Sequence, residues 1–144
     1  MKIGQFQVGK TNVFIIAEIG NNHNGSLKLA LEMVDSAVDV GADCVKFQMR
    51  DMASVYRKKS LEKQGEDLGT EYVLDLLERF QLSTDEHKEV GEYCASKGIL
   101  YMCTPWDSSS VDTLEKFKVP AYKVASADLT TLPLIDHLIS TEKP

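Results

Sequence analysis

The sequence predicts an α/β fold in which four strand–helix units follow a small N-terminal β-hairpin. Two patterns predict this fold class. Short, continuous apolar runs alternate with segments whose apolar residues recur at helical spacing, which is typical of parallel strands covered by helices. A complete (β/α)8 barrel needs roughly 250 residues. The 144-residue chain, expected to be a single domain over 1–144, therefore corresponds to the first half of a TIM barrel or to a small open sheet.

The first half of the chain contains one helix between two strands. The apolar run at its start predicts a buried strand, and the following residues have a three-and-four apolar spacing that predicts a helix. Ser, Asn and Gly stand where such a helix would be capped. The expected elements are a hairpin over residues 2–9, a strand over 13–18, a helix that begins after Asn24 or Ser26 and ends at Gly41, and a strand over 42–48.

The second half opens with a polar segment, residues 49–69, which has no clear period and indicates a mobile excursion over a site. A later Ser and Glu form the pattern of a capping box. Proline was expected to end the third strand, because it cannot donate to the ladder. The expected elements are a helix after Thr70 through Phe80, a helix from Ser83 with Glu86 to Gly98, a strand over 99–103 stopped by Thr104 and Pro105, a helix over 108–117, a strand over 121–125 and a helix over 132–139. The chain ends where a next strand would begin, which suggests a fragment of a longer protein.

The composition limits the possible partners and location. A net charge of −6 and a pI of about 5.0 argue against a nucleic-acid or anionic-membrane partner. No apolar stretch approaches the roughly 20 residues of a membrane span, and the N-terminus lacks a signal peptide's apolar core. We therefore expect a cytoplasmic protein. Cys44, Cys94 and Cys103 lie in apolar contexts without metal-ligand spacing, so we expect buried free thiols.

Polar side chains follow the apolar runs of all four expected strands. Burying an unpaired charge costs several kcal/mol, so such groups must meet each other, a metal or a charged ligand. Ligands of α/β sheets bind at the carboxyl ends of the strands. Lysine ammonium and hydroxyl groups suit a phosphate or carboxylate. The candidate residues are Glu18, Lys46, Gln48, Thr104 and Lys123, with Ser126 and Asp128 just beyond the last strand.

Some of these residues also have a structural interpretation. The lysines could extend to solvent and pair with acids. His23 lies in the glycine- and asparagine-rich turn after Glu18, where it could donate a hydrogen bond to a substrate or serve as a capping or loop residue. His87 and His137 fall within expected helices and are interpreted as surface residues.

Four sequence blocks resemble the N-terminal barrel of the sialic acid synthase family: IIAEIGNNHNGS, GADCVKFQ, YMCTPWD and PAYKVASADLT. They occur in order, with similar spacing, and cover nearly the whole chain. The resemblance implies an enzyme that condenses phosphoenolpyruvate with an N-acylated amino sugar, such as N-acetylmannosamine or a related sugar. The product would be a nine-carbon 2-keto acid, and phosphate would be released.

The resemblance also implies roles for individual residues. Those that would hold phosphoenolpyruvate are Lys46, Thr104, Lys123 and Ser126. Glu18 and Gln48 would face the sugar, with Glu18 the candidate for acid–base work. Asp128 stands where many members have a glutamate and is the second catalytic candidate. Trp106 could pack on substrate or simply fill the core.

Other implied features lie outside this chain. Family members use a divalent metal, manganese or magnesium, whose histidine ligands belong to later strands, and many have a C-terminal antifreeze-like domain that completes the site of a partner subunit. We therefore expect a homodimer in the full-length protein, no metal ligands here, and no activity from this chain alone. Two other functions stay open: a related phosphoenolpyruvate-dependent condensing aldolase with another acceptor, and a non-catalytic phosphate- or sugar-binding module.

Overall fold

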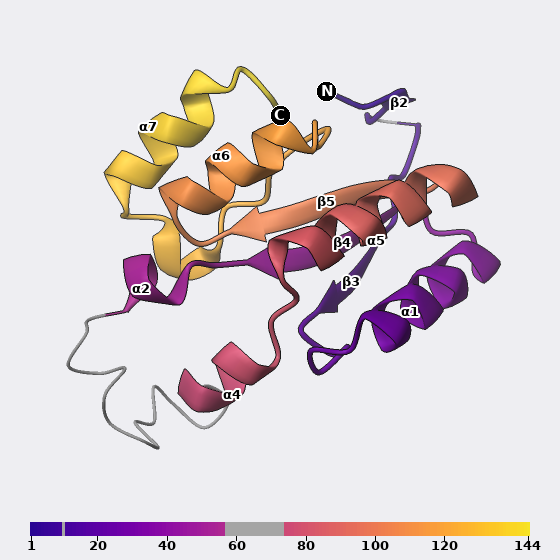
Figure 1. Cartoon of the computed structure of the whole chain (residues 1–144). Coiled ribbons are helices and arrows are strands. Elements are labelled where there is room, and N and C mark those ends of the chain that lie inside the picture. Colours follow the sequence, from indigo (N-terminus) through magenta and orange to yellow (C-terminus); the bar gives the residue numbers. More distant parts are fainter. Residues whose placement is uncertain (10, 57–73) are drawn as a thin grey trace.

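A computed structural model describes residues 1–9, 11–56 and 74–144, and it places most of the expected elements in the expected order (Figure 1). The strands are β1 (Lys2–Ile3), β2 (Phe6–Gln7), β3 (Ile16–Gly20), β4 (Cys44–Met49) and β5 (Leu100–Pro105). The helices are α1 (Leu27–Asp39), α2 (Met52–Val55), α4 (Leu74–Arg79), α5 (Thr84–Lys97), α6 (Ser108–Lys116) and α7 (Leu132–Ser140), with a short 3-10 helix, η1 (Ser126–Asp128). Most of the excursion expected over 49–69, and Thr70, lie outside the described residues.

The central sheet has three parallel strands in the order β3-β4-β5, which confirms the α/β class and the parallel pairing. The expected hairpin is confirmed as the antiparallel pair β1 and β2. The register aligns Lys46 of β4 with Glu18 of β3 and with Met102 of β5, and it aligns Gln48 with Thr104. Aligned residues of neighbouring strands point to the same face. Most of the polar residues predicted at the strand ends therefore share one face of the sheet.

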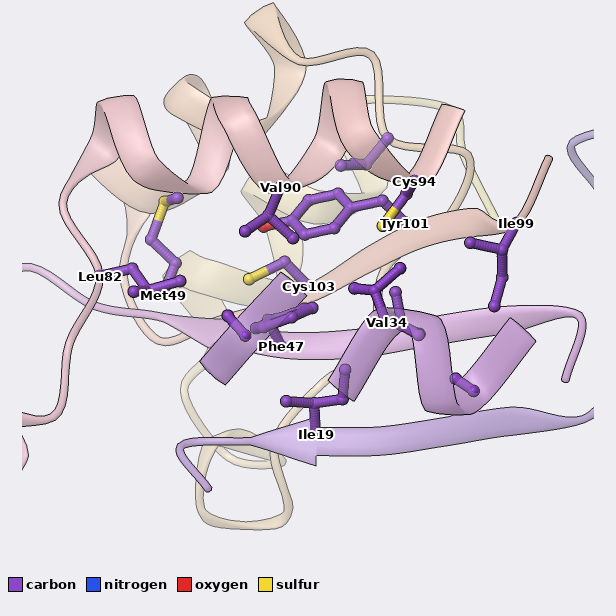
Figure 2. Close-up of a cluster of buried hydrophobic side chains, with 14 of the residues drawn as sticks. Ile19, Val34, Phe47, Met49, Leu82, Val90, Cys94, Ile99, Tyr101 and Cys103 are labelled. Atoms are coloured by element: carbon purple, nitrogen blue, oxygen red, sulfur yellow. The ribbon is translucent and has the colours of Figure 1, made fainter. Parts of the chain in front are cut away.

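The opposite face of the sheet carries the main hydrophobic core (Figure 2). Phe47 is fully buried there and lies against Tyr101, with ring centroids 5.7 Å apart. Helices α1 and α5 cover this face, contributing Val34 and Val90 among other residues. Because apolar and polar residues alternate along β4, one short strand supplies both the core and the polar face.

The polar face is closed at the amino end of the strands by a smaller apolar cluster. Ile3 of the hairpin packs there with Cys44, Met102 and Ala121. The hairpin therefore covers one end of the sheet, as predicted, and the carboxyl end remains for polar groups.

The helix boundaries agree with the capping signals. The Ser26 hydroxyl accepts a hydrogen bond from the Leu29 amide at the start of α1. Ser83 and Glu86 form a reciprocal capping box at the start of α5, and Gly98 ends that helix in the left-handed conformation. Helix α2 was not predicted; it begins after Asp51, whose carboxylate accepts from the Ala53 amide.

The prediction of a fourth strand over 121–125 is wrong. Only one parallel bridge joins this segment to β5, between Tyr122 and Cys103. The Tyr122 amide donates instead to the Pro144 carbonyl at 2.9 Å. A strand needs repeated backbone pairing with a neighbour, which a single bridge does not provide.

Two other strand boundaries differ from the prediction. The strand expected over 13–18 begins only at Ile16, the first residue aligned with β4, although the Ile15 carbonyl already accepts from the Asp43 and Cys44 amides. Strand β5 continues through Pro105 instead of stopping before it. The next amide, that of Trp106, donates to the Met49 carbonyl at 3.0 Å. Alternate amides of a strand point to opposite sides, so proline's missing donor faces away from β4.

No helix in the described ranges is long and apolar enough to cross a membrane. The closure of a TIM barrel by further strands stays a prediction.

Candidate functional site

A pocket of about 460 Å³ opens at the carboxyl ends of the parallel strands. Seven of the nine predicted site residues line it. They are Glu18, Lys46, Gln48, Thr104, Trp106, Lys123 and Ser126. Asn21 and Asn22 of the turn after β3 also line it, as do Leu76, Leu77 and Phe80 at α4. The polar strand ends therefore converge on one place, as the sequence predicted.

Lys46 lies at the centre of a small polar network in the pocket wall. Only 8% of the residue is exposed, because β3 and β5 flank its strand. Its ammonium contacts the Glu18 carboxylate and donates a hydrogen bond to the Thr104 hydroxyl at 3.5 Å. The Glu18 side chain is half exposed, so it meets both the lysine and the solvent-filled pocket.

Lys123 and Ser126 reach the same pocket although their segment is not a strand. The bridge at Tyr122 holds this segment beside β5, and Ala125, buried between the two residues in sequence, anchors it. Lys46 and Lys123 are thus two cationic side chains on one cavity, flanked by the hydroxyls of Thr104 and Ser126. Two ammonium groups with nearby hydroxyl donors can hold a phosphate or a carboxylate.

A second network lies beside the first and includes Arg50, which the sequence reasoning missed. The Arg50 guanidinium donates to the Gln48 side-chain oxygen at 2.5 Å. It also stacks over the Trp106 ring, with 4.5 Å between Cζ and the ring centroid. A cation directly after an apolar strand repeats the pattern of Lys46 and is the sequence signal for a site residue at Arg50. The assignment of residues 49–69 to a polar excursion overlooks this signal.

His23 does not line the pocket, and its surroundings favour the structural alternative over a contact with substrate. The side chain is 1% exposed and packs against Phe47 on the core face, with ring centroids 5.8 Å apart. Its Nδ1 accepts a hydrogen bond from the Gly25 amide at 3.1 Å. Burial lowers the pKa of His23, which favours the neutral ring. His23 is therefore a structural residue of the turn, one of the two alternatives considered.

Asp128, the second catalytic candidate, also lies outside the pocket lining. It belongs to η1, where its Oδ1 accepts from the Thr131 hydroxyl at 3.3 Å. Its Oδ2 is buried without a hydrogen-bond partner among the described residues. Because the turn at η1 presents Ser126 to the pocket, the carboxylate two residues later points elsewhere.

Other predictions concern side chains of the core. The three cysteines are buried free thiols, as predicted, and burial raises the pKa of each to about 12. His87 is 2% exposed, so its assignment to the surface is wrong. Its Nδ1 lies 2.9 Å from the Tyr101 hydroxyl. His137 is more accessible and lies 3.2 Å from an Asp112 oxygen.

The described ranges, 1–9, 11–56 and 74–144, contain no group of three His, Cys, Asp or Glu side chains placed to hold a metal ion.

The fold and the pocket define an α/β protein with a candidate ligand site at the carboxyl ends of parallel strands. Two lysine side chains line this site. Residues 33–144 match the NeuB family, and the chain belongs to that family. The resemblance to the sialic acid synthase family is thereby confirmed.

Individual relatives support the same assignment. An uncharacterised protein of Methanocaldococcus jannaschii is 41% identical over 145 residues, which cover 100% of this chain and 40% of that protein. The N,N'-diacetyllegionaminic acid synthase of Legionella pneumophila is 37% identical over 137 residues, which cover 91% of this chain and 38% of that protein. A crystal structure of N-acetylneuraminic acid synthetase from Leptospira borgpetersenii, in complex with citrate, matches with a TM-score of 0.79 and 31% identity. The match covers 95% of this chain and 45% of that protein. This chain spans about two-fifths of the length of these curated relatives.

Proposed function

We propose that the protein containing this chain condenses phosphoenolpyruvate with an N-acylated amino sugar to form a nine-carbon 2-keto acid, and that phosphate is released. N-acetylmannosamine, or a related amino sugar, is the proposed acceptor. The observation that carries the proposal is the convergence of Lys46 and Lys123 with Thr104 and Ser126 on one pocket. Relatives named as synthases of acidic amino sugars support this choice over a binding module.

The side chains that line the pocket suit both substrates. Lys46 and Lys123 would hold the phosphate and carboxylate of phosphoenolpyruvate, with hydroxyls of Thr104 and Ser126 as additional donors. Glu18 and Gln48 would face the uncharged sugar, since a carboxylate and an amide bind hydroxyl and carbonyl groups without adding a positive charge.

The reaction forms one carbon–carbon bond and breaks one bond to phosphate. C3 of phosphoenolpyruvate attacks the aldehyde carbon of the open-chain sugar, and the aldehyde oxygen takes up a proton. Water adds at C2, and the resulting tetrahedral carbon loses phosphate to leave the 2-keto group. Glu18 would move a proton at the sugar oxygen, and the lysines would balance the charge of the departing phosphate; the pocket position of Glu18 supports this role.

The test is a phosphate-release assay on the complete protein, with Mn²⁺ and phosphoenolpyruvate present, and with product identification by mass spectrometry. The acceptors should include N-acetylmannosamine, a diacetamido-trideoxy hexose, arabinose 5-phosphate and erythrose 4-phosphate. We expect phosphate and a nine-carbon keto acid with one of the two amino sugars. Turnover with a sugar phosphate alone would assign the protein to the related aldolases, and binding without turnover of any acceptor would leave a binding module.

A further inference from the structure

Arg50 is a buried cation beside the pocket that does not itself line it. It is 6% exposed, and its guanidinium lies against Gln48 and Trp106, both of which do line the pocket. These two side chains are therefore routes by which Arg50 can influence a ligand in the pocket.

Arginine fixes the direction of the Gln48 amide by its chemistry. The guanidinium has five donors and no acceptor, so only the amide oxygen of Gln48 can face it. The observed contact is from Nη2 to Oε1 at 2.5 Å. The amide nitrogen must then point the other way. A Cβ added at Gly20, another pocket-lining residue, would lie 3.3 Å from Gln48 Nε2, which places this nitrogen on the pocket side.

The backbone around Arg50 is held to the segment that carries Trp106. The Trp106 amide donates to the Met49 carbonyl at 3.0 Å, and the Asp51 amide donates to the Asp107 carboxylate at 2.7 Å. The first bond joins the residue before Arg50 to Trp106 itself, and the second joins the residue after Arg50 to the residue after Trp106. The stacking of guanidinium on indole is thus built into the ends of β4 and β5, and burial protects it from competing water.

We propose that Arg50 is a positioning residue that holds the Gln48 NH₂ toward the pocket, as a donor to an acceptor oxygen of the sugar substrate. The proposal rests on the proposed function and adds a basis for substrate recognition. A neutral NH₂ donor selects a hydroxyl or acyl carbonyl oxygen, whereas the lysine ammonium groups select the anion. Arg50 orients the NH₂ group of Gln48, and its own guanidinium does not line the pocket. Its stacking on Trp106 fixes the indole that forms the neighbouring wall.

A double-mutant cycle in the complete protein tests whether Arg50 acts through Gln48. The variants are Arg50→Met, Gln48→Ala and the double substitution, with Arg79→Met, on the exposed side of α4, as the matched control. We expect each single variant to raise the KM for the amino sugar roughly fivefold, and the KM for phosphoenolpyruvate less than twofold. The KM of the double variant for the amino sugar should stay within about twofold of the value for Gln48→Ala, because the interaction is already lost in that variant. A KM that rises in the double variant by the product of the two single effects would overturn the proposal.

Two further variants keep Arg50 or its charge, so a cation remains at this position. Gln48→Glu keeps the contact with Arg50 but replaces the donor with an acceptor oxygen, so the sugar KM should rise at least about tenfold. Arg50→Lys keeps one donor but loses the planar stack, and it should fall between wild type and Arg50→Met. An unchanged sugar KM in Gln48→Glu would overturn the donor role.

An NMR measurement separates failure of this inference from failure of the proposed function. Protons of the Gln48 NH₂ should show a nuclear Overhauser effect to the Gly20 α-protons in the wild type, and Arg50→Met should lose it. This readout needs no substrate. Persistence of the same effect in Arg50→Met would overturn the positioning role even if the enzyme proved active, whereas an inactive wild type would overturn only the proposed function.

Discussion

The Glu18 carboxylate contacts the Lys46 ammonium across the β3–β4 pair, so the buried lysine of the pocket is partly neutralised by its own protein. The contact also sets the geometry, because Lys46 is held between Glu18 and the Thr104 hydroxyl. A bound anion would share this lysine with Glu18. The two side chains therefore form one functional unit, and substitutions of each should have different kinetic effects.

Replacing Lys46 or Lys123 with Met should weaken phosphoenolpyruvate binding. Each change removes one ammonium from the pocket while keeping much of the aliphatic length of the side chain. We expect the KM for phosphoenolpyruvate to rise, or kcat to fall, by at least about tenfold, at roughly 1.4 kcal/mol per decade. Steady-state phosphate release by the complete protein measures this. Lys28→Met, on the exposed face of α1, is the control and should behave as wild type. Wild-type kinetics in both pocket variants would contradict the anion site.

Glu18→Gln should separate catalysis from anion binding. The amide keeps the size of the side chain but leaves the Lys46 charge uncompensated, so the KM for phosphoenolpyruvate should stay the same or fall. Loss of the acid–base group should lower kcat by roughly a hundredfold or more. The same phosphate-release assay reports both constants. A raised phosphoenolpyruvate KM with normal kcat would instead make Glu18 a support for Lys46 only.

His87 should make the protein less stable in mild acid. Burial lowers its pKa to about 4 in the folded protein, with a further contribution from His23, while the unfolded chain has a value near 6.5. The folded state thus resists protonation of His87. The contribution of the neutral ring to the unfolding free energy is complete above pH 6.5 and is lost as the pH falls toward 4. This contribution amounts to roughly 3 kcal/mol.

Urea unfolding at several pH values between 7 and 4 checks this contribution. His87→Gln, which can keep a hydrogen bond to the Tyr101 hydroxyl, should flatten the pH dependence of the unfolding free energy. His137→Gln, at a more accessible histidine, serves as the control and should retain the wild-type slope. Equal slopes in wild type and His87→Gln would contradict the contribution of His87 to the acid sensitivity.

The sequence predicted the polar site well because its signals are local. The alternation of polar and apolar residues in β4 places Lys46 and Gln48 on one face, and parallel pairing brings Glu18 and Thr104 beside them. Helix ends were also readable, since the capping box at Ser83 depends only on nearby residues.

The missed features depend on contacts between distant segments. His23 and His87 look like turn and helix residues in sequence, yet both are buried against Phe47. The segment 121–125 has the composition of a strand, but pairing depends on its neighbours and only Tyr122 forms a bridge. The wall that α4 adds to the pocket could not be derived either, because helical periodicity does not say which sheet edge a helix will face.

Gly25 should be far less tolerant of substitution than Gly41, although both have φ near 76°. Alanine at either position has a left-handed backbone, which costs roughly 1–2 kcal/mol. At Gly41 the new Cβ meets no described atom within 4 Å, whereas at Gly25 it would lie 2.3 Å from the Arg79 carbonyl oxygen. Backbone cannot move aside as a flexible side chain can.

The end of α4 must therefore shift in Gly25→Ala, and this helix end carries Phe80 of the pocket wall. We expect Gly25→Ala to lower the unfolding free energy by at least about 2 kcal/mol more than Gly41→Ala, and to reduce the proposed phosphate release below the unfolding temperature. Urea denaturation and phosphate release on both variants measure the two effects. Equal stability of the two variants would show that the turn before α1 and the end of α4 do not pack as described.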